Sequence, residues 1–204
     1  MNSSNESLTG KTNASRLFVA VALPTDQRRK LEEYTSRLRE RSPKCRAAWV
    51  RPENFHLTLR FLGDTPMDQV TKIGQVLDEA VSNVHVFNLS IARTGTFNSG
   101  RSNVVLWIGF AGDLEILNSV KAGVDLGLAK FNIKQERVRF NPHLTIARIR
   151  DADNCGALIQ AHKNAEIKQF DFDVRELLLI KGDLDPNGAR YSVVHRSPFT
   201  AKLQ

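Results

Sequence analysis

The chain has 204 residues, of which 41% are hydrophobic and 25% are charged, and its formal net charge is +7. This composition is typical of a soluble globular protein, and the sequence contains no apolar run long enough to span a membrane. The basic charge favours an anionic partner, most commonly a nucleic acid, although many soluble proteins are mildly basic without one.

The N-terminal segment Met1 to Ser15 is rich in Ser, Asn and Thr and has no apolar signal core. We expect a disordered tail there, not a secretion signal, and a single domain over residues 16–204. Cys45 and Cys155 are the only cysteines. Two cysteines give no disulfide framework and no plausible zinc site, which fits a protein of the reducing cytoplasm. We also expect the protein to be a monomer.

The first half of the chain alternates between strand and helix patterns. Arg16–Leu23 is short, aliphatic and aromatic, which predicts a strand, and Thr25 begins a helix that runs to about Arg41. His56–Leu62 alternates as a second strand, and the apolar spacing within Pro66–Val81 predicts a second helix.

The second half contains more strands, several of them joined as hairpins. The predicted strands are Val86–Phe97, Val104–Phe110, one within Arg137–Arg150, Glu176–Asp183 and Tyr191–Phe199, and the predicted helices are Leu114–Ala129 and Asn154–Asn164. Hairpin-linked strands without strict strand–helix–strand alternation favour an α+β fold with mostly antiparallel sheets. We expect two pseudo-symmetric lobes with helices on the outside and an active site in the central cleft.

One short sequence motif occurs twice, and this repetition suggests the two pseudo-symmetric lobes. Asn54-Phe55-His56-Leu57-Thr58-Leu59 is repeated, 87 residues later, as Asn141-Pro142-His143-Leu144-Thr145-Ile146. Side chains alternate between the two faces of a strand, so each copy presents a His-Thr pair on one face and its aliphatic residues on the other. By the same parity Phe61 lies on the opposite face, and Arg60 joins the first pair, where it either contacts the substrate or is a solvated strand residue.

The paired motif is suited to acid–base chemistry on a phosphodiester. One neutral imidazole accepts a proton from water, a second, protonated imidazole supplies one to the leaving oxygen, and the two threonine hydroxyls steady the phosphoryl oxygens. A single copy would more often be a structural histidine. A zinc site built from His56 and His143 would lack evident third and fourth ligands. We expect the other histidines, His85, His162 and His195, to be surface or structural residues.

The paired motifs resemble those of the 2H phosphoesterase superfamily, and the phrasing is similar to its bacterial and archaeal RNA 2′,3′-cyclic phosphodiesterases, historically called 2′-5′ RNA ligases. The segments that carry this resemblance, which covers about residues 16–200, are Arg16–Leu23, Asn54–Gly63, Pro142–Arg148 and Glu176–Leu184 with Gly188 and Tyr191. The resemblance implies a bilobal fold, no cofactor and no metal. It also implies hydrolysis of RNA 2′,3′-cyclic phosphate ends to 2′-phosphates.

The resemblance also implies roles for particular residues. His56 would be the proton donor and His143 the proton acceptor, and Arg148 would contact the substrate. Strict alternation places Arg148 on the face opposite His143, and a bulge or a strand end near Ala147 would reconcile this with a substrate contact. Phe18 shares its face with two alanines, so it either stacks on a nucleobase or belongs to the core.

Several alternatives stay open from the sequence. The same site can act on a small cyclic nucleotide or on 2′-5′ oligoadenylate, and it can run in reverse as a 2′-5′ RNA ligase. A non-catalytic module that binds RNA ends is a further alternative, although two complete His-Thr pairs argue against it.

Overall fold

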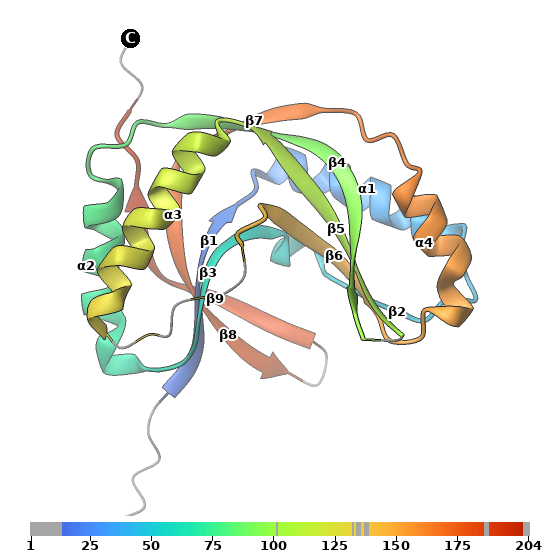
Figure 1. Ribbon diagram of the computed structural model, residues 1–204, viewed down its shortest axis with the longest axis horizontal. Helices are drawn as coiled ribbons and strands as arrows, with labels where there is room; N and C mark the ends of the chain where they lie inside the picture. Colours follow the sequence, from blue (N-terminus) through green and yellow to red (C-terminus); the bar gives the residue numbers. More distant parts are fainter. Residues whose placement is uncertain are drawn as a thin grey trace, which may run out of the picture.

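The structure is a computed structural model that describes residues 14–100, 102–131, 133, 136, 139–185 and 188–201, within which the chain forms two antiparallel sheets and four α-helices (Figure 1). The strands are β1 (Ala14–Ala22), β2 (Ala47–Trp49), β3 (His56–Pro66), β4 (Phe87–Ser99), β5 (Asn103–Gly112), β6 (His143–Ile149), β7 (Phe170–Val174), β8 (Glu176–Asp185) and β9 (Gly188–Pro198). The helices are α1 (Thr25–Glu40), α2 (Val70–Val81), α3 (Leu114–Leu128) and α4 (Gly156–Lys163). The predicted α+β class is confirmed.

The two sheets divide the repeated motif between them. The four-stranded sheet has the order β3-β1-β8-β9 and contains His56, whereas the five-stranded sheet has the order β2-β6-β5-β4-β7 and contains His143. Each histidine begins its strand, and β3 and β6 contact each other where the sheets meet. Two related half-structures therefore meet along the two motif strands.

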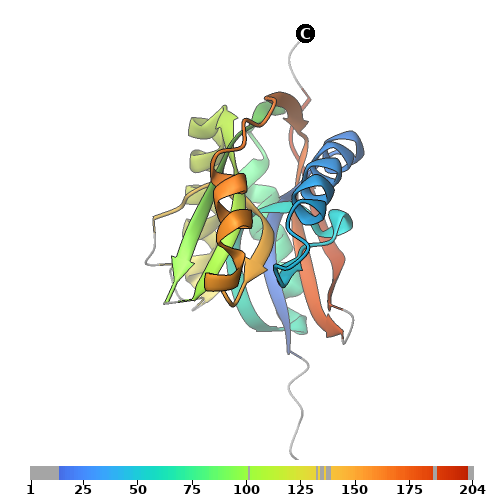
Figure 2. The ribbon, with the colours of Figure 1, turned by 90° about the vertical axis from the view of Figure 1, so that its right-hand side faces the viewer.

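The helices cover the outside of the arch that the sheets form (Figures 1 and 2). Helices α2 and α3 pack against each other beside the four-stranded sheet, and α1 and α4 pack together beside the five-stranded sheet. Helix α1 follows β1 and helix α3 follows β5, so each of these helices crosses from its own sheet to the other lobe. This exchange makes the packing of each lobe depend on the other.

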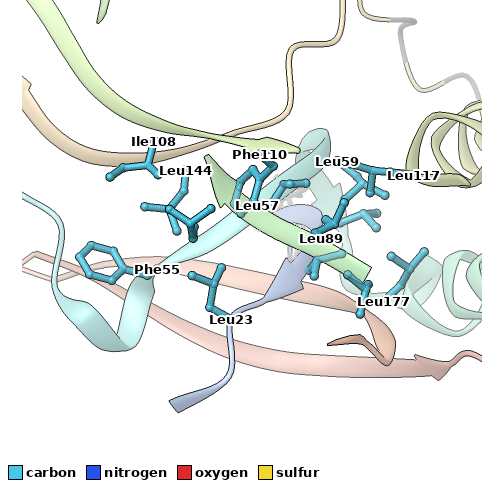
Figure 3. Close-up of a cluster of buried hydrophobic side chains, with 14 of the residues drawn as sticks. Leu23, Phe55, Leu57, Leu59, Leu89, Ile108, Phe110, Leu117, Leu144 and Leu177 are labelled. Atoms are coloured by element: carbon cyan, nitrogen blue, oxygen red, sulfur yellow. The ribbon is translucent and has the colours of Figure 1, made fainter. Parts of the chain in front are cut away.

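A continuous cluster of buried aliphatic and aromatic side chains lies between the sheets (Figure 3). Leu57 and Leu59 of β3 and Leu144 of β6 are at most 1% exposed and point into it. The aliphatic side of each motif is thus buried, as the alternation predicts, and burial of several large side chains at about 2 kcal/mol each holds the two motif strands in place.

The ends of the predicted elements differ in a few places. Ala14 and Ser15 already pair with Pro66 and Thr65, so β1 begins inside the segment expected to be a tail, and the rest of that segment lies outside the described residues. The short strands β2 and β7 were missed, although Phe170–Val174 alternates as a strand should. No helix in the described part of the chain is long and apolar enough to cross a membrane.

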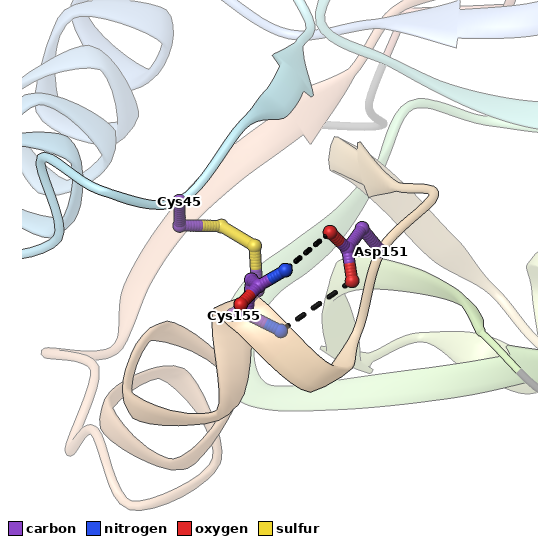
Figure 4. Close-up of a disulfide and its surroundings, with 4 residues drawn as sticks. Cys45, Asp151 and Cys155 are labelled. Carbon is purple, nitrogen blue, oxygen red and sulfur yellow. Dashed lines mark hydrogen bonds between the residues drawn. A yellow bond between two sulfur atoms is a disulfide. The ribbon is translucent and has the colours of Figure 1, made fainter.

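The two cysteines are bonded to each other (Figure 4). Cys45 lies two residues before β2, and Cys155 lies immediately before α4, at a sequence separation of 110. The expectation that the cysteines form no disulfide is wrong, because the fold brings together two segments whose proximity their spacing did not reveal. The cysteines therefore no longer support the inference of a reducing cytoplasm.

His162 links the two helices of one lobe to the sheet beneath them. It is fully buried, and its Nε2–H donates to the carbonyl oxygens of Gly95 and Trp107, each at 3.1 Å. Its Nδ1 therefore accepts a hydrogen bond from the hydroxyl of Tyr34 at 2.8 Å, and burial lowers the pKa of His162. This neutral, fully hydrogen-bonded ring is a structural histidine, as expected.

Candidate active site

The two His-Thr pairs line one cleft between the sheets. The cleft has a volume of about 1190 Å³, and His56, Thr58, His143 and Thr145 all contribute to its wall. The alternation of the first residues of β3 and β6 explains this, because the leucines beside them point the opposite way into the core. Folding therefore brings together the four residues that the sequence singled out.

The two imidazole rings are held in the same way. Nδ1 of His56 lies 2.7 Å from the carbonyl oxygen of Asn54, and Nδ1 of His143 lies 2.7 Å from that of Asn141. A carbonyl oxygen only accepts, so Nδ1 carries the proton in both rings. In the neutral rings Nε2 is then an acceptor, and in a protonated ring Nε2–H is a donor.

The asparagine shared by the two motifs anchors each of these carbonyls. The side-chain amide of Asn54 donates to the carbonyl oxygen of Ala189 at 2.9 Å, and the Oδ1 atom of Asn141 accepts from Arg93 at 3.5 Å. The backbone of any residue supplies the carbonyl, but these side chains tie the segment before each histidine to a more distant strand of the same sheet, β9 for Asn54 and β4 for Asn141. That gives a physical reason for asparagine at both positions.

Aromatic rings fix the orientation of both histidines. The ring of His56 stacks on Phe18 with centroids 4.9 Å apart and meets the edge of Tyr191 at 5.4 Å. The ring of His143 meets Phe97 edge-to-face at 4.9 Å and lies 6.3 Å from Trp107. Of these aromatic neighbours, the sequence had proposed only Phe18 as a site residue.

The ring of Phe18 packs against the imidazole ring of His56. It is 5% exposed and packs with Ala20, Leu178 and Ile180 in a small second cluster of buried side chains. Its ring faces the imidazole, so the structure favours the core alternative over stacking on a nucleobase.

A bulge in each motif strand changes which residues share the face of the histidine. In the pairing of β5 with β6, Leu106 lies opposite Ala147 and Trp107 lies opposite Thr145, so one extra residue of β6 is accommodated there. Ala147 is consequently buried, and Arg148 is exposed and lines the cleft. The bulge expected near Ala147 is confirmed, and it places Arg148 on the side of His143.

The corresponding bulge in β3 brings Phe61 to the cleft and leaves Arg60 outside the cleft wall. In the pairing of β1 with β3, Val19 lies opposite Arg60 and Ala20 lies opposite Thr58, so Leu59 is the extra residue. Phe61 is therefore 59% exposed and lines the cleft, at the position that corresponds to Arg148 in the second motif. The expectation that Phe61 faces away from the cleft is wrong, because strict alternation does not anticipate a bulge.

Arg60 does not join His56 and Thr58. It is 2% exposed, and it forms ion pairs with Asp125 of α3 at 3.6 Å and with Glu136 at 3.4 Å. Lys121 contacts the same two carboxylates, at 2.8 and 3.4 Å. The predicted substrate contact of Arg60 is wrong, and its charge instead ties β3 to α3 and to the segment that precedes the second motif.

The environment lowers the pKa of both motif histidines below the ordinary value of 6.5. For His56 the causes are burial and then the charge of His143, while the hydrogen bond to Asn54 opposes the shift. For His143 they are burial and then the charge of Arg148, opposed by the hydrogen bond to Asn141. The two rings are thus close enough for one charge to disfavour the other, so a singly protonated pair is the favoured charged state.

These shifts predict an acidic pH optimum for any reaction that needs one protonated and one neutral imidazole. Activity falls as pH rises through the lowered pKa values, because the proton of the acid is lost, and it falls again at lower pH when both rings are protonated. The pH profile of kcat/KM, measured from about pH 4.5 to about pH 8, should peak below 6.5. A maximum above that value would contradict the lowered pKa values.

Comparison with known proteins agrees with this geometry. A family model described as LigT like Phosphoesterase matches residues 21–107 and 112–191. The chain belongs to the LigT-like phosphoesterase family. The RNA 2′,3′-cyclic phosphodiesterase of Methanothermobacter thermautotrophicus is 29% identical over 182 residues, which are 87% of this chain and 95% of that protein. The protein of the same name from Aquifex aeolicus is 30% identical over 74% of this chain and 81% of its own length.

Solved structures share the LigT-like fold. TT0787 of Thermus thermophilus superposes with a TM-score of 0.73 at 23% identity, covering 92% of this chain and all of that chain. LigT of E. coli in its apo form superposes with a TM-score of 0.68 at 21% identity, covering 92% of this chain and 98% of that chain. In this chain's described part no group of three or more His, Cys, Asp or Glu residues is placed to hold a metal ion.

Proposed function

We propose that this LigT-like phosphoesterase hydrolyses RNA ends that carry a 2′,3′-cyclic phosphate and leaves a 2′-phosphate. The observation that carries the proposal is the pair of imidazoles in one cleft, each with Nδ1 bound to a backbone carbonyl and Nε2 as the nitrogen left for acid–base chemistry. The names of the relatives and the basic net charge of +7 support RNA as the substrate class.

In the proposed reaction His143 acts as the base and His56 as the acid. Nε2 of His143 takes a proton from water, the water oxygen bonds to phosphorus, the bond from phosphorus to the 3′ oxygen breaks, and Nε2–H of His56 protonates that oxygen. The charge of Arg148 lowers the pKa of His143 in addition to burial, which favours the neutral ring that a base requires. The hydroxyls of Thr58 and Thr145 donate to the non-bridging oxygens.

Phe61 and Arg148 are suited to hold the terminal nucleotide. They occupy matching positions after the two histidines, and both line the cleft. An exposed aromatic ring and a guanidinium plane each offer a flat surface on which a base can stack. We therefore place the terminal base near these two side chains and the cyclic phosphate between the histidines.

The test is hydrolysis in the presence of EDTA. A short RNA with a 2′,3′-cyclic phosphate should be converted to the 2′-phosphate alone, because the two imidazoles supply both proton transfers and only the 3′ oxygen is protonated. Chromatography against synthetic 2′- and 3′-phosphate standards identifies the product. Turnover that requires an added metal ion, or a 3′-phosphate product, would contradict the proposal. Slow formation of 2′-5′ linked RNA from the 2′,3′-cyclic and 5′-hydroxyl ends would be the same displacement at the same site, with the 5′-hydroxyl in place of water and the 3′ oxygen again leaving.

A further inference from the structure

A row of three residues crosses the five-stranded sheet on the side of the cleft. Arg93 of β4 lies opposite Gly109 of β5, and Gly109 lies opposite His143 of β6. Residues paired across a sheet point to the same face, and neighbouring strands are about 4.8 Å apart. Arg93 therefore shares the face of His143, with its Cα about 10 Å away across the two strand spacings.

Glycine at position 109 leaves the space that the side chain of Arg93 occupies. A Cβ atom at Gly109 would lie 2.7 Å from Nε and 2.8 Å from Cγ of Arg93, so the arginine side chain lies directly over the glycine. A register shift between Ile91 and Arg93 accompanies this placement. Any larger residue at position 109 would displace the arginine from this part of the sheet.

The guanidinium is held by neutral groups. It lies over the ring of Trp107, 5.8 Å from the centroid, and its Nη2 donates to Oδ1 of Asn141 at 3.5 Å. Among the described residues no carboxylate forms an ion pair with Arg93. Its charge is therefore oriented toward the cleft without being neutralised, which is the state in which a guanidinium binds phosphate as a planar fork.

The cleft also extends beyond the two His-Thr pairs. Its wall includes Arg93 and Arg139, both exposed, and Asn118 of α3, in a volume of about 1190 Å³. Arg148 is a different cation, since its charge acts on His143 itself. The wall thus offers positive charge at a second place, and the Cα atom of Arg93 lies about 10 Å from that of His143.

We propose that Arg93, together with Arg139, binds the phosphodiester on the 5′ side of the terminal nucleotide. An RNA chain end has this phosphate and a cyclic mononucleotide lacks it, so this subsite makes the enzyme selective for chain ends. The inference rests on the proposed function, because it assumes that the cyclic phosphate lies between His56 and His143.

The test compares two substrates that end in a 2′,3′-cyclic phosphate. One is a linear dinucleotide, which has the additional phosphodiester, and the other is the corresponding mononucleotide, which lacks it. Arg93→Gln should lower kcat/KM about tenfold or more on the dinucleotide, and Arg93→Gln with Arg139→Gln should lower it further. On the mononucleotide Arg93→Gln should cost at most about threefold, since Arg93 also holds Asn141. Arg29→Gln is the matched control, because it removes an exposed arginine of α1 that is not part of the cleft wall.

The outcomes separate the subsite from the proposed function. Equal losses on both substrates would mean that Arg93 serves the histidines alone, and no loss on either would mean that it binds nothing; both overturn the subsite. If the native enzyme turns over neither substrate, the proposed function fails, and fluorescence anisotropy with a labelled trinucleotide decides the subsite. Binding that Arg93→Gln weakens tenfold would support it, and binding that this variant leaves unchanged would overturn it.

Discussion

His56→Ala and His143→Ala should each lower kcat/KM for a 2′,3′-cyclic phosphate by about 10³-fold or more, because each removes one of the two proton transfers. The double variant should be little worse than either single variant, since the two groups act on the same transition state. Steady-state kinetics with the linear dinucleotide that ends in a 2′,3′-cyclic phosphate measures the kcat/KM of each variant. His85→Ala is the matched control, because His85 is exposed and lies outside the cleft.

A sulfur leaving group assigns the two roles. In a substrate with sulfur in place of the 3′ oxygen, the departing thiolate is stable without a proton, so an acid is no longer needed. This substrate should restore much of the activity of His56→Ala and none of that of His143→Ala. Rescue of His143→Ala instead would exchange the acid and the base, and rescue of neither would argue against acid catalysis of the leaving group.

Loss of the disulfide should be the largest effect on stability. The bond closes a loop with a sequence separation of 110, and a loop of that size stabilises the folded state by about 4.7 kcal/mol in the chain-entropy model. In a protein of this size the loss corresponds to a fall in melting temperature of about 10 °C. Differential scanning fluorimetry of the variant with both Cys45→Ser and Cys155→Ser measures it.

The control for this prediction is the reducing agent itself. Treatment of the native protein with a phosphine reductant should lower its melting temperature by a similar amount, whereas the same treatment of the double serine variant should change nothing. A native protein whose melting temperature ignores the reductant would show that the bond does not contribute to stability. Cys155 is 1% exposed, so reduction is best carried out on the protein before it is heated, with sufficient time for access.

The repeated motif allowed the centre of the site to be predicted from the sequence. A His-x-Thr strand with leucines between the polar residues has one geometry that buries its apolar side, and two copies imply two such strands. The structure places His56, Thr58, His143 and Thr145 in one cleft accordingly. Local alternation was sufficient here because the first three residues of each strand precede any bulge.

The periphery of the site depended on features that alternation does not contain. The bulges in β3 and β6 bring Phe61 and Arg148 to the cleft and bury Arg60 among carboxylates. The bulge in β6 was anticipated only because a resemblance required Arg148 at the site. Arg93 was missed altogether, since its partner in the row, Gly109, belongs to another strand.

The sequence by itself thus determined the α+β class, most of the helices and strands, and the two His-Thr pairs, because these depend on the spacing of apolar and polar residues within one segment. The tertiary structure alone decided which strands are neighbours, where the register shifts, that α1 and α3 cross to the opposite lobe, and that Cys45 meets Cys155. These features depend on contacts between segments far apart in the chain. Such contacts are set by the packing of the whole core and leave no periodic signal in the sequence of either segment.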